Sequence, residues 1–502
     1  MLGRAAGAVL VGVHARLVDV EVHLGGGLPN IAAVGLAQSS VREGIDRIRA
    51  ALQHAGFKLP QRRVTVSLAP ADVRKEGAAL DLPIAAAILG ADGRLGERPF
   101  TDVVLAGELA LDGAVRPVRG VLGIALAARA AGRTGLVVPA SNVPEAQLVD
   151  GLRVWGVARL ADAVALLKHP ALVPEAPRRV PEAEAPAVYE DLADVRGQKT
   201  ARRALEIAAA GGHHVLLCGP PGTGKTMLAR RLAGIMPELT HEEALEVTQI
   251  WSAAGLASGL VARRPFRAPH HGISLAGLVG GGLALKPGEI ALAHGGVLYL
   301  DELPEFRRDA LEALRGPLES GDVAVVRLHA RAVFPARFLL AASMNPCPCG
   351  WARDPRGRCR CTPNEVHRYL AKLSGPLLDR IDLTVNVPAV DPGDLAAAKA
   401  GEPSSAVRAR VVAARERQHG RFGGCNAHMG RADLERHAPL DDAGRRLLVS
   451  ACRHLGLTAR AFDRIRRTAR TIADLEGADA IAQEHVAEAV HYRDVDPALS
   501  PS

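Results

Sequence analysis

Eight consecutive residues near the middle of the chain restrict its architecture: Gly219-Pro220-Pro221-Gly222-Thr223-Gly224-Lys225-Thr226. An apolar run, 213–218, precedes them and a helix-like run, 227–232, follows. Glycines in such a loop let backbone N–H groups surround an anion, and the positive end of the next helix points at it. The pattern predicts a phosphate-binding loop in which Lys225 binds the β- and γ-phosphates and the Thr226 hydroxyl binds Mg²⁺.

Two carboxylates follow a second apolar segment, 295–300, at Asp301 and Glu302. An Asp at the carboxyl end of a strand can hold Mg²⁺ through water, and an adjacent Glu can polarise the attacking water. A third apolar segment ends at Asn345, whose amide could position the same water. We therefore expect ATP hydrolysis, with Glu302 and Asn345 as catalytic residues and Asp301 at the Mg²⁺.

The composition fits a soluble protein with more than one core: 502 residues, 48% hydrophobic and 23% charged. The 62 Lys and Arg exceed the 54 Asp and Glu, which favours polyanionic partners slightly. The apolar N-terminus continues as an alternating strand pattern, unlike a signal peptide. No uncharged apolar stretch reaches the roughly 18 residues of a membrane span. Seven cysteines, an odd number, beside a nucleotide site indicate a cytoplasmic protein with reduced thiols.

The spacing of apolar residues and turn signals divides the chain into α/β and α+β domains. Residues 1–168 alternate short strands and helices, and 189–390 alternate strand and helix as in a parallel-sheet phosphate-loop fold. Between them, 169–188 is rich in Pro, Ala, Glu and Arg and is predicted to be a linker. Residues 391–502 are predicted to form a helical lid. Within 1–168 we expect helices over 41–56 and 82–89, a strand over 64–68 and a hairpin turn at Asp112-Gly113.

Part of the first domain, 107–118 and 127–132, resembles the proteolytic domain of Lon proteases. That family uses a Ser–Lys dyad. The resemblance places the Ser position at Ala79 and the candidate Lys positions at Leu122 and Ile124. Without a nucleophile or its base, acyl transfer is not expected. The resemblance therefore implies an inactive protease fold kept for interaction or assembly.

A basic, glycine-rich insert lies between the phosphate loop's helix and the carboxylate strand. From 255 to 289, four cations stand against one acid, Glu289. A flexible basic loop suits contact with nucleic-acid phosphates, although a solvated loop with buried histidines is the alternative. A hairpin with its turn around 329–331 could project toward the same partner. The candidate DNA-binding residues are Arg263, Arg264, Arg267 and Lys286.

Two Cys-x-Cys pairs follow Asn345, with nine residues between them. Four thiolates this close could bind one structural Zn²⁺ tetrahedrally. The spacing is tighter than the usual Cys-x₂-Cys, so free or merely buried thiols are the alternative. The four candidates are Cys347, Cys349, Cys359 and Cys361.

Several segments together resemble the magnesium-chelatase-like AAA+ ATPases of the ComM/YifB type. The resemblance covers nearly the full chain, including the Lon-like domain. It implies hexameric rings, a relation to the ATPase subunit of magnesium chelatase and to replicative MCM helicases, and DNA branch migration during natural transformation. The segments that carry it are 267–271, 286–290, 300–306, 345–350 and 374–382, while 192–198 is similar to the segment beside the adenine in AAA+ ATPases.

The resemblance also assigns two arginines. Arg380 would be an arginine finger that stabilises charge on a neighbouring subunit's ATP, and Arg460 the second sensor. Alternatives to a DNA motor are a chelatase-type or protein-remodelling motor, and an ATP-dependent peptidase, which Ala79 argues against. Arg460 stands at the start of a predicted helix, and most of the other arginines of this helix are expected on a solvated or DNA-facing side: Arg464, Arg466, Arg467 and Arg470.

Overall fold

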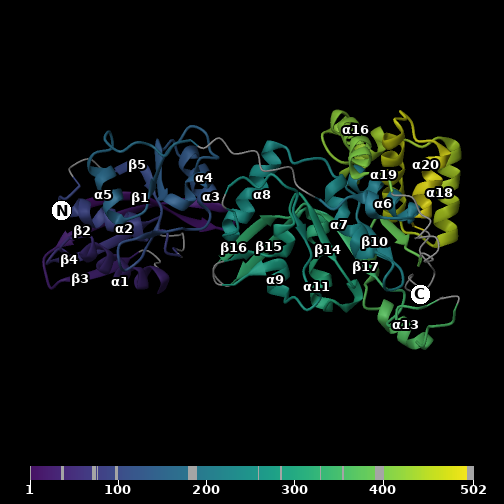
Figure 1. Ribbon diagram of the computed structural model, residues 1–502, viewed down its shortest axis with the longest axis horizontal. Coiled ribbons are helices and arrows are strands. Elements are labelled where there is room, and N and C mark those ends of the chain that lie inside the picture. The colour runs from purple at the N-terminus through teal and green to yellow at the C-terminus, as the bar shows by residue number, and fades with distance from the viewer. Residues whose placement is uncertain are drawn as a thin grey trace.

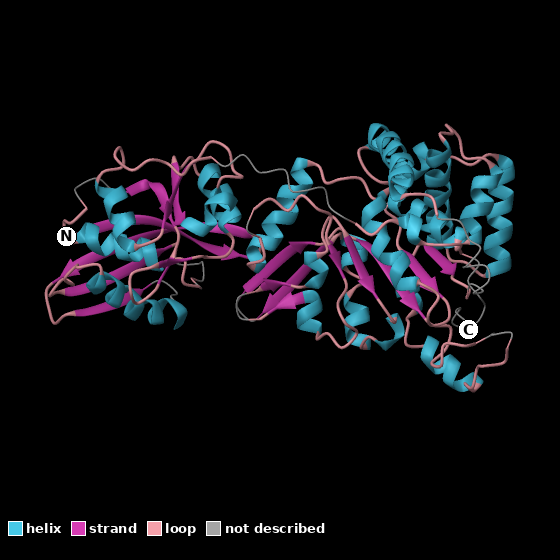
Figure 2. Ribbon diagram, in the orientation of Figure 1, coloured by secondary structure: helices cyan, strands magenta, loops and turns pink. Residues whose placement is uncertain are grey.

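The computed structural model describes most of the chain between residues 2 and 493. Figure 1 shows three parts along the longest axis: an N-terminal domain, a central domain, and a C-terminal group of helices. Strands are concentrated in the first two parts, and helices fill the third (Figure 2). The described residues are 2–34, 39–70, 75, 77–95, 100–178, 189–257, 259–282, 285–327, 330–352, 356–389 and 401–493.

A seven-stranded sheet forms the framework of the N-terminal domain. Its strands are β1 (Leu2–Val11), β2 (His14–Gly25), β3 (Asn30–Val34), β4 (Arg63–Ala69), β5 (Phe100–Leu105), β8 (Gly135–Pro139) and β9 (Arg153–Val157). They lie in the order β3-β4-β2-β1-β5-β8-β9. β1 and β2 form an antiparallel hairpin, and the others add both parallel and antiparallel pairs. Alternate residues of β2, such as Val18 and Val20, are buried, as the alternating sequence predicts.

The helices of this domain pack on the sheet: α1 (Ser39–His54), α2 (Asp81–Ala91), α3 (Val121–Ala130), α4 (Val143–Ala146) and α5 (Leu160–Lys168). All but one residue of α2 is buried, because the helix is apolar on every side. The predicted helices and strand are confirmed with end shifts of at most two residues. The predicted hairpin is formed by β6 (Glu108–Leu109) and β7 (Val115–Arg116).

The central domain is built on five parallel strands, which confirms the predicted parallel sheet. They are β10 (Val215–Cys218), β11 (Phe266–Arg267), β14 (Val297–Leu300), β17 (Leu339–Met344) and β18 (Leu383–Asn386), in the order β11-β14-β17-β10-β18. Nearly every residue of the three middle strands is buried, because helices cover both faces of a parallel sheet. The carboxyl ends of β14, β17 and β10 therefore meet at one edge.

The C-terminal helices pack on this sheet domain. They are α16 (Ser404–Phe422), α17 (Arg431–His437), α18 (Asp442–Leu455), α19 (Ala459–Glu476) and α20 (Gln483–His491). One hydrophobic core joins the two parts and includes Leu217 of β10, Val411 of α16 and Ile465 of α19. Residues 390–400, at the predicted start of the lid, lie outside the described part. No helix in the described ranges is long and apolar enough to cross a membrane.

Half of the predicted linker lies against the N-terminal domain. Ala176 donates its N–H to the carbonyl of Val154 at 2.9 Å, and the Trp155 indole donates to the carbonyl of Val173 at 3.4 Å. The other half, 179–188, is outside the described residues.

The N-terminal and central domains meet at α8 (His241–Ala254). Glu145 accepts hydrogen bonds from the backbone of Leu122 at 2.8 Å and from the Ser252 hydroxyl of α8. Val13, in the β1–β2 turn, is buried in the core of the central domain, and its carbonyl accepts from Gln249 at 3.0 Å. The two domains thus share polar and apolar contacts.

Candidate nucleotide-binding site

The predicted phosphate loop lies between β10 and α7 (Lys225–Ile235), at the carboxyl edge of the parallel sheet. Gly222 and Gly224 have φ of 78° and 85°, a left-handed conformation that only glycine adopts readily. Gly219 lies so close to the residue after β18 that a Cβ there would be 2.2 Å from the carbonyl oxygen of Val387. Backbone geometry alone therefore requires glycine at these positions.

The ammonium group of Lys225 lies inside this loop. It donates to the carbonyls of Gly219 and Pro220 at 2.7 and 2.8 Å, and to Oδ1 of Asn345 at 3.1 Å. Burial lowers the pKa of Lys225, because desolvation disfavours its charged form. The structure thus brings together the lysine from β10's loop and the asparagine at the end of β17.

The two predicted Mg²⁺ ligands are in direct contact. Thr226 Oγ1 donates to Asp301 Oδ2 at 3.0 Å. Burial opposes ionisation of Asp301, but hydrogen bonds from Ser343 and Thr226 outweigh it and lower the pKa of this carboxyl. Asp301 is therefore a carboxylate at neutral pH. A carboxylate and a hydroxyl at the end of a β-strand suit Mg²⁺, so these residues fit the implied metal.

Two further residues, which the sequence patterns did not single out, orient this pair. The Ser343 hydroxyl donates to Asp301 Oδ1, and the Tyr299 hydroxyl, with one proton to donate, lies 3.2 Å from both Thr226 Oγ1 and Ser343 Oγ. Asp301 directly follows β14, two residues after Tyr299, and the alternation of side chains along a strand places both on the same side. The sequence signals for these two residues were that spacing and the presence of a serine within an otherwise apolar strand.

Glu302 leaves the strand in a left-handed conformation, with φ of 55°. For a residue with a side chain this backbone geometry is strained, and such strain is common at functional sites. Its side chain is 52% exposed, which leaves the carboxylate accessible to water. The imidazole of His271, from the insert, lies 3.8 Å from Glu302 Oε2 and packs edge-on against Phe306.

Arg380 and Arg460 converge on one carboxylate, away from the phosphate loop. Arg380 donates to Glu319, and Arg460 lies 3.9 Å from the other oxygen of that carboxylate. They line a cavity of about 670 Å³ whose wall contains no residue of 219–226. The Arg380 side chain is 10% exposed and that of Arg460 is 66% exposed. The structure therefore places the two predicted arginines together but not beside the loop of their own chain.

Most arginines of α19 make internal contacts. For three of them the prediction that they lie on a solvated or DNA-facing side is therefore wrong. Arg464 donates to Asp382 Oδ1 at 2.6 Å and to the carbonyl of Arg380 at 2.9 Å. Arg466 donates to the backbone carbonyls of Leu434, in α17, and of Ala438, just after it, and Arg470 donates to Asp474. These contacts connect α19 to α17 and to segment 380–382 of the central domain, because buried carbonyls and carboxylates need donors.

Asp382 connects this helix to the phosphate-loop strand. Its Oδ2 accepts the backbone N–H of His214 at 3.0 Å, immediately before β10. Burial opposes its ionisation, but Arg464 and His213 hold the pKa of Asp382 well below its usual range. The segment that carries Arg380 is thereby joined both to α19 and to β10.

The insert is more ordered than its sequence predicts. It contains α9 (Leu275–Val279), α10 (Glu289–Leu292) and short strands β11, β12 (Gly280–Gly281) and β13 (Lys286–Pro287). Arg267 makes two hydrogen bonds, at 2.6 and 2.7 Å, to Glu289, the one acid of the insert.

Arg264 is also used internally. Its side chain is 8% exposed and donates to the carbonyls of Pro237 and Gly295 and to Glu243. Internal acceptors thus occupy the guanidinium groups of both Arg264 and Arg267 in this structure, and their contact with DNA stays a prediction. Arg263 and Lys286 lie at the surface.

The second predicted nucleic-acid element is an antiparallel hairpin, β15 (Asp322–Arg327) and β16 (Ala330–Pro335). Ala330 and Arg331, predicted in the turn, belong to β16. Residues 328–329 lie outside the described part of the chain. Val326 and Val333 of the hairpin are exposed.

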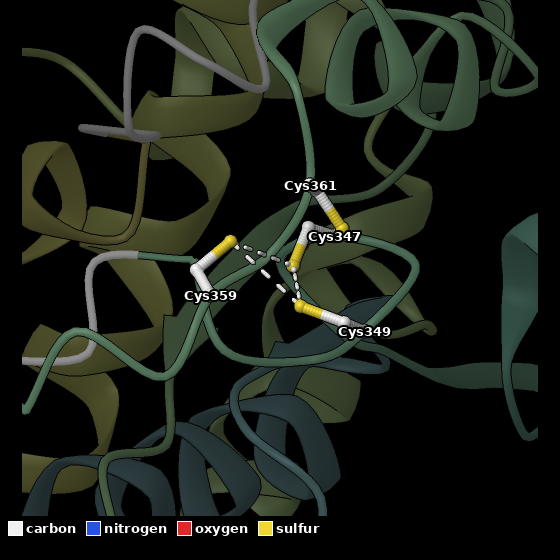
Figure 3. A group of neighbouring side chains, drawn as sticks. All are labelled: Cys347, Cys349, Cys359 and Cys361. Carbon is white, nitrogen blue, oxygen red and sulfur yellow. Dashed lines mark hydrogen bonds between the residues drawn. The ribbon is translucent and has the colours of Figure 1, made fainter.

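The four predicted cysteines come together after β17 (Figure 3). Their Sγ atoms all lie within 4.8 Å of one another. Cys347 Sγ is 3.4 Å from Cys349 Sγ and 3.9 Å from Cys359 Sγ, and the last two are 3.7 Å apart. This group can bind a metal ion.

The site combines a phosphate loop, an Asp-Glu pair and an asparagine at adjacent strand ends, beside the C-terminal helices. This is the arrangement of an AAA+-type nucleotide-binding protein. Family models agree with this class. Residues 191–395 match the model of magnesium chelatase, subunit ChlI. Residues 20–142 match that of subunit ChlI of Mg-chelatase, and 401–493 match its C-terminal model.

Full-length relatives define the family more narrowly. The protein YifB of Salmonella typhimurium is 45% identical over 494 residues, which cover 97% of this chain and 96% of that one. Competence protein ComM of Haemophilus influenzae is 46% identical over 489 residues, 96% of each chain. The magnesium-chelatase 38 kDa subunit of Rhodobacter capsulatus is 32% identical over 169 residues, 30% of this chain and 48% of that one. The chain belongs to the ComM/YifB family of magnesium-chelatase-like proteins.

Proposed function

We propose that this protein is a ring-forming ATPase that hydrolyses ATP with Mg²⁺ and uses the energy to remodel single-stranded or branched DNA in the cytoplasm. The observation that carries the ATPase part is the convergence of Lys225, Thr226, Asp301 and Asn345 at one sheet edge. Binding, metal-holding and water-positioning groups are then within reach of one nucleotide.

Each residue of the site has a distinct proposed role. Lys225, now paired with loop carbonyls, would exchange them for the β- and γ-phosphate oxygens. Thr226 and Asp301 would hold Mg²⁺, which supplies charge neutralisation on the phosphates. Glu302, exposed and turned out of the strand, would accept a proton from the attacking water, while Asn345 orients that water.

The two arginines support a ring. Arg380 and Arg460 face a cavity that the phosphate loop of their own chain does not line. A guanidinium group stabilises phosphoryl transfer only at contact distance, so we propose that this pair acts on the nucleotide of a neighbouring subunit. The site is then complete only between subunits, and a closed ring, proposed to be a hexamer, supplies every site with its arginines.

Three observations support DNA as the partner. The chain carries an excess of eight positive charges. Arg263 and Lys286, at the surface of the insert, are the proposed phosphate contacts. The relative from Haemophilus influenzae is named a competence protein. We therefore propose branch migration during natural transformation or recombination as the activity.

The N-terminal domain is proposed to be a non-catalytic, Lon-protease-like domain. The candidate dyad positions hold Ala79, Leu122 and Ile124, and the last two are buried in α3. The buried contacts of Glu145 and Val13 suit a role in assembly with the ATPase domain. Besides ATP and Mg²⁺, we propose one structural zinc ion, held by the four-cysteine group.

Stimulation of ATP hydrolysis by candidate partners tests this function. We expect single-stranded or branched DNA to raise the hydrolysis rate, and an unfolded protein or a porphyrin to leave it unchanged. Stimulation by the porphyrin or the unfolded protein instead would favour a chelatase-type or protein-remodelling motor. The same measurement on Glu302→Gln provides the background rate.

A further inference from the structure

The four-cysteine group is built like a tetrahedral thiolate site. A metal at about 2.3 Å from four sulfurs places the sulfurs about 3.8 Å apart. Three of the pairs lie at 3.4, 3.7 and 3.9 Å, and all four sulfurs fall within 4.8 Å. Cys347 is fully buried, and the backbone N–H of Ala352 donates to its sulfur at 3.2 Å. An N–H donor to a ligand sulfur favours the thiolate form.

The segment that bears these cysteines packs on the phosphate loop. Gly350 has φ of 82°, and its N–H donates to the carbonyl of Cys347 at 2.9 Å, which closes a tight turn. A Cβ on Gly350 would lie 2.6 Å from Cδ of Pro221, in the phosphate loop, and 3.8 Å from Cγ of Asn345. The turn thus touches both the loop and the catalytic asparagine.

The rest of the segment is closed by a second contact that needs no metal. The guanidinium of Arg358 stacks over the Trp351 ring, 3.4 Å from its centroid. This brings the second Cys-x-Cys pair back toward the first, across residues 353–355, which are outside the described part.

We infer that Zn²⁺ bound by Cys347, Cys349, Cys359 and Cys361 locks the 345–350 turn against the phosphate loop and thereby sets the position of Asn345 for catalysis. Zinc is favoured because four thiolates match its preferred tetrahedral sulfur set. Asn345 lies two residues before the first ligand, so the metal fixes the chain on one side of it and β17 fixes the other. Loss of zinc would release the turn and move Asn345 away from Lys225. The inference rests on the proposed ATP hydrolysis for its catalytic readout.

The test compares a ligand variant with a matched cysteine variant in the full-length protein. The double variant Cys359→Ser/Cys361→Ser removes two ligands, and Cys452→Ser, in α18, removes a thiol outside the group. Elemental analysis should find about one zinc per chain in the wild type and in Cys452→Ser, and almost none in the double variant. The kcat of the double variant should fall about 10- to 100-fold, with a smaller change in KM, because a displaced catalytic group costs about that much.

A second variant keeps all four cysteines and disturbs the turn itself, through both its packing and its left-handed backbone. Gly350→Ala should retain zinc, yet lower kcat and weaken binding of a fluorescent ATP analogue, because its Cβ would press on Pro221. If the double variant does not fold, Gly350→Ala still tests whether the position of the turn affects catalysis.

Three outcomes would overturn the inference: wild-type protein without zinc and with all four thiols freely titratable, a zinc-free double variant with unchanged kcat, or Gly350→Ala with native kinetics. If the wild type holds zinc and binds ATP but hydrolyses none, the proposed ATPase function fails instead. The locked turn is then judged by affinity for the ATP analogue, which should fall when zinc is removed and would contradict the inference if it did not.

Discussion

The ammonium group of Lys225 donates a hydrogen bond to the side-chain oxygen of Asn345 across 3.1 Å. This bond joins the phosphate loop after β10 to the residue that follows β17, 120 positions later in the chain. Because β10 and β17 are neighbours in a parallel sheet, their carboxyl ends deliver both side chains to one place. The group that would bind phosphate therefore lies next to the group that would orient water.

Lys225 and Glu302 should separate nucleotide binding from hydrolysis. Lys225→Ala removes the charge that pairs with phosphate, so we expect binding of ATP to be abolished. Glu302→Gln removes only the proton acceptor, so binding should persist while turnover falls at least about 100-fold. Equilibrium binding of a labelled nucleotide and release of phosphate measure the two effects. Hydrolysis by Glu302→Gln at the native rate would disprove the assigned site.

Arg380 should act across a subunit boundary. Arg380→Ala alone is expected to lower kcat by about a thousandfold, as removal of an arginine finger does. Mixed with Glu302→Gln, which retains Arg380, it should regain activity, because some sites then combine an intact Glu302 with a neighbour's intact Arg380. Phosphate release is measured over a series of mixing ratios. If no ratio restores hydrolysis, the arginine acts within its own chain.

His214 should make the protein less stable in mild acid. Burial lowers the pKa of His214 to about 4, and its Nδ1 accepts the backbone N–H of Leu340. Between about pH 6.5 and pH 4 the unfolded chain binds a proton that the folded chain does not. The free energy of unfolding should therefore fall as pH decreases, by up to about 3 kcal/mol over this window.

The control for this effect is His214→Asn, whose amide oxygen can replace Nδ1 as the acceptor for Leu340. Denaturant unfolding at several pH values should show a flatter dependence for the variant, whatever its absolute stability. Nearby Asp382 and His213 are unchanged and act in both proteins. Identical pH dependence in the two proteins would show that His214 is not the titrating group.

Arginines of the insert should divide into structural and DNA-binding residues. Arg264→Ala leaves three backbone carbonyls without the hydrogen bonds that Arg264 donates to them. The free energy of unfolding should therefore fall by about 2 kcal/mol or more. The pair Arg263→Ala/Lys286→Ala should lower the melting temperature less than Arg264→Ala does. It should weaken DNA binding at all sequences and reduce the slope of log affinity against log salt by about one for each phosphate that is no longer neutralised. An unchanged slope with a lowered melting temperature would assign these two residues to subunit packing instead.

Short motifs with fixed local geometry could be predicted from the sequence. The eight residues at 219–226, the Asp301-Glu302 pair and the asparagine after β17 each follow an apolar strand, so their approximate place in a parallel sheet could be inferred. Ser343 and Glu319 could not, because one polar residue in an apolar strand or on a short helix carries no visible partner. Such contacts depend on how separate elements pack.

Charge patterns were less informative than motifs. The sequence shows that the insert is basic. It does not show that Glu289 pairs with Arg267, or that Arg264 is buried and donates to backbone carbonyls. Similarly, Arg464 pairs with Asp382, 82 positions away. A pattern of arginines on a helix is the same whether they face solvent or a neighbouring element, so only the packed structure distinguishes these cases.

ATP-dependent movement of a branched DNA tests the central proposal most directly. A fluorescently labelled three- or four-way junction is incubated with the protein, ATP and Mg²⁺, and strand separation is followed over time. The wild type should resolve the junction only with hydrolysable ATP, and Glu302→Gln should bind the junction without resolving it. Wild-type protein that hydrolyses ATP but neither binds nor resolves the junction would contradict the account.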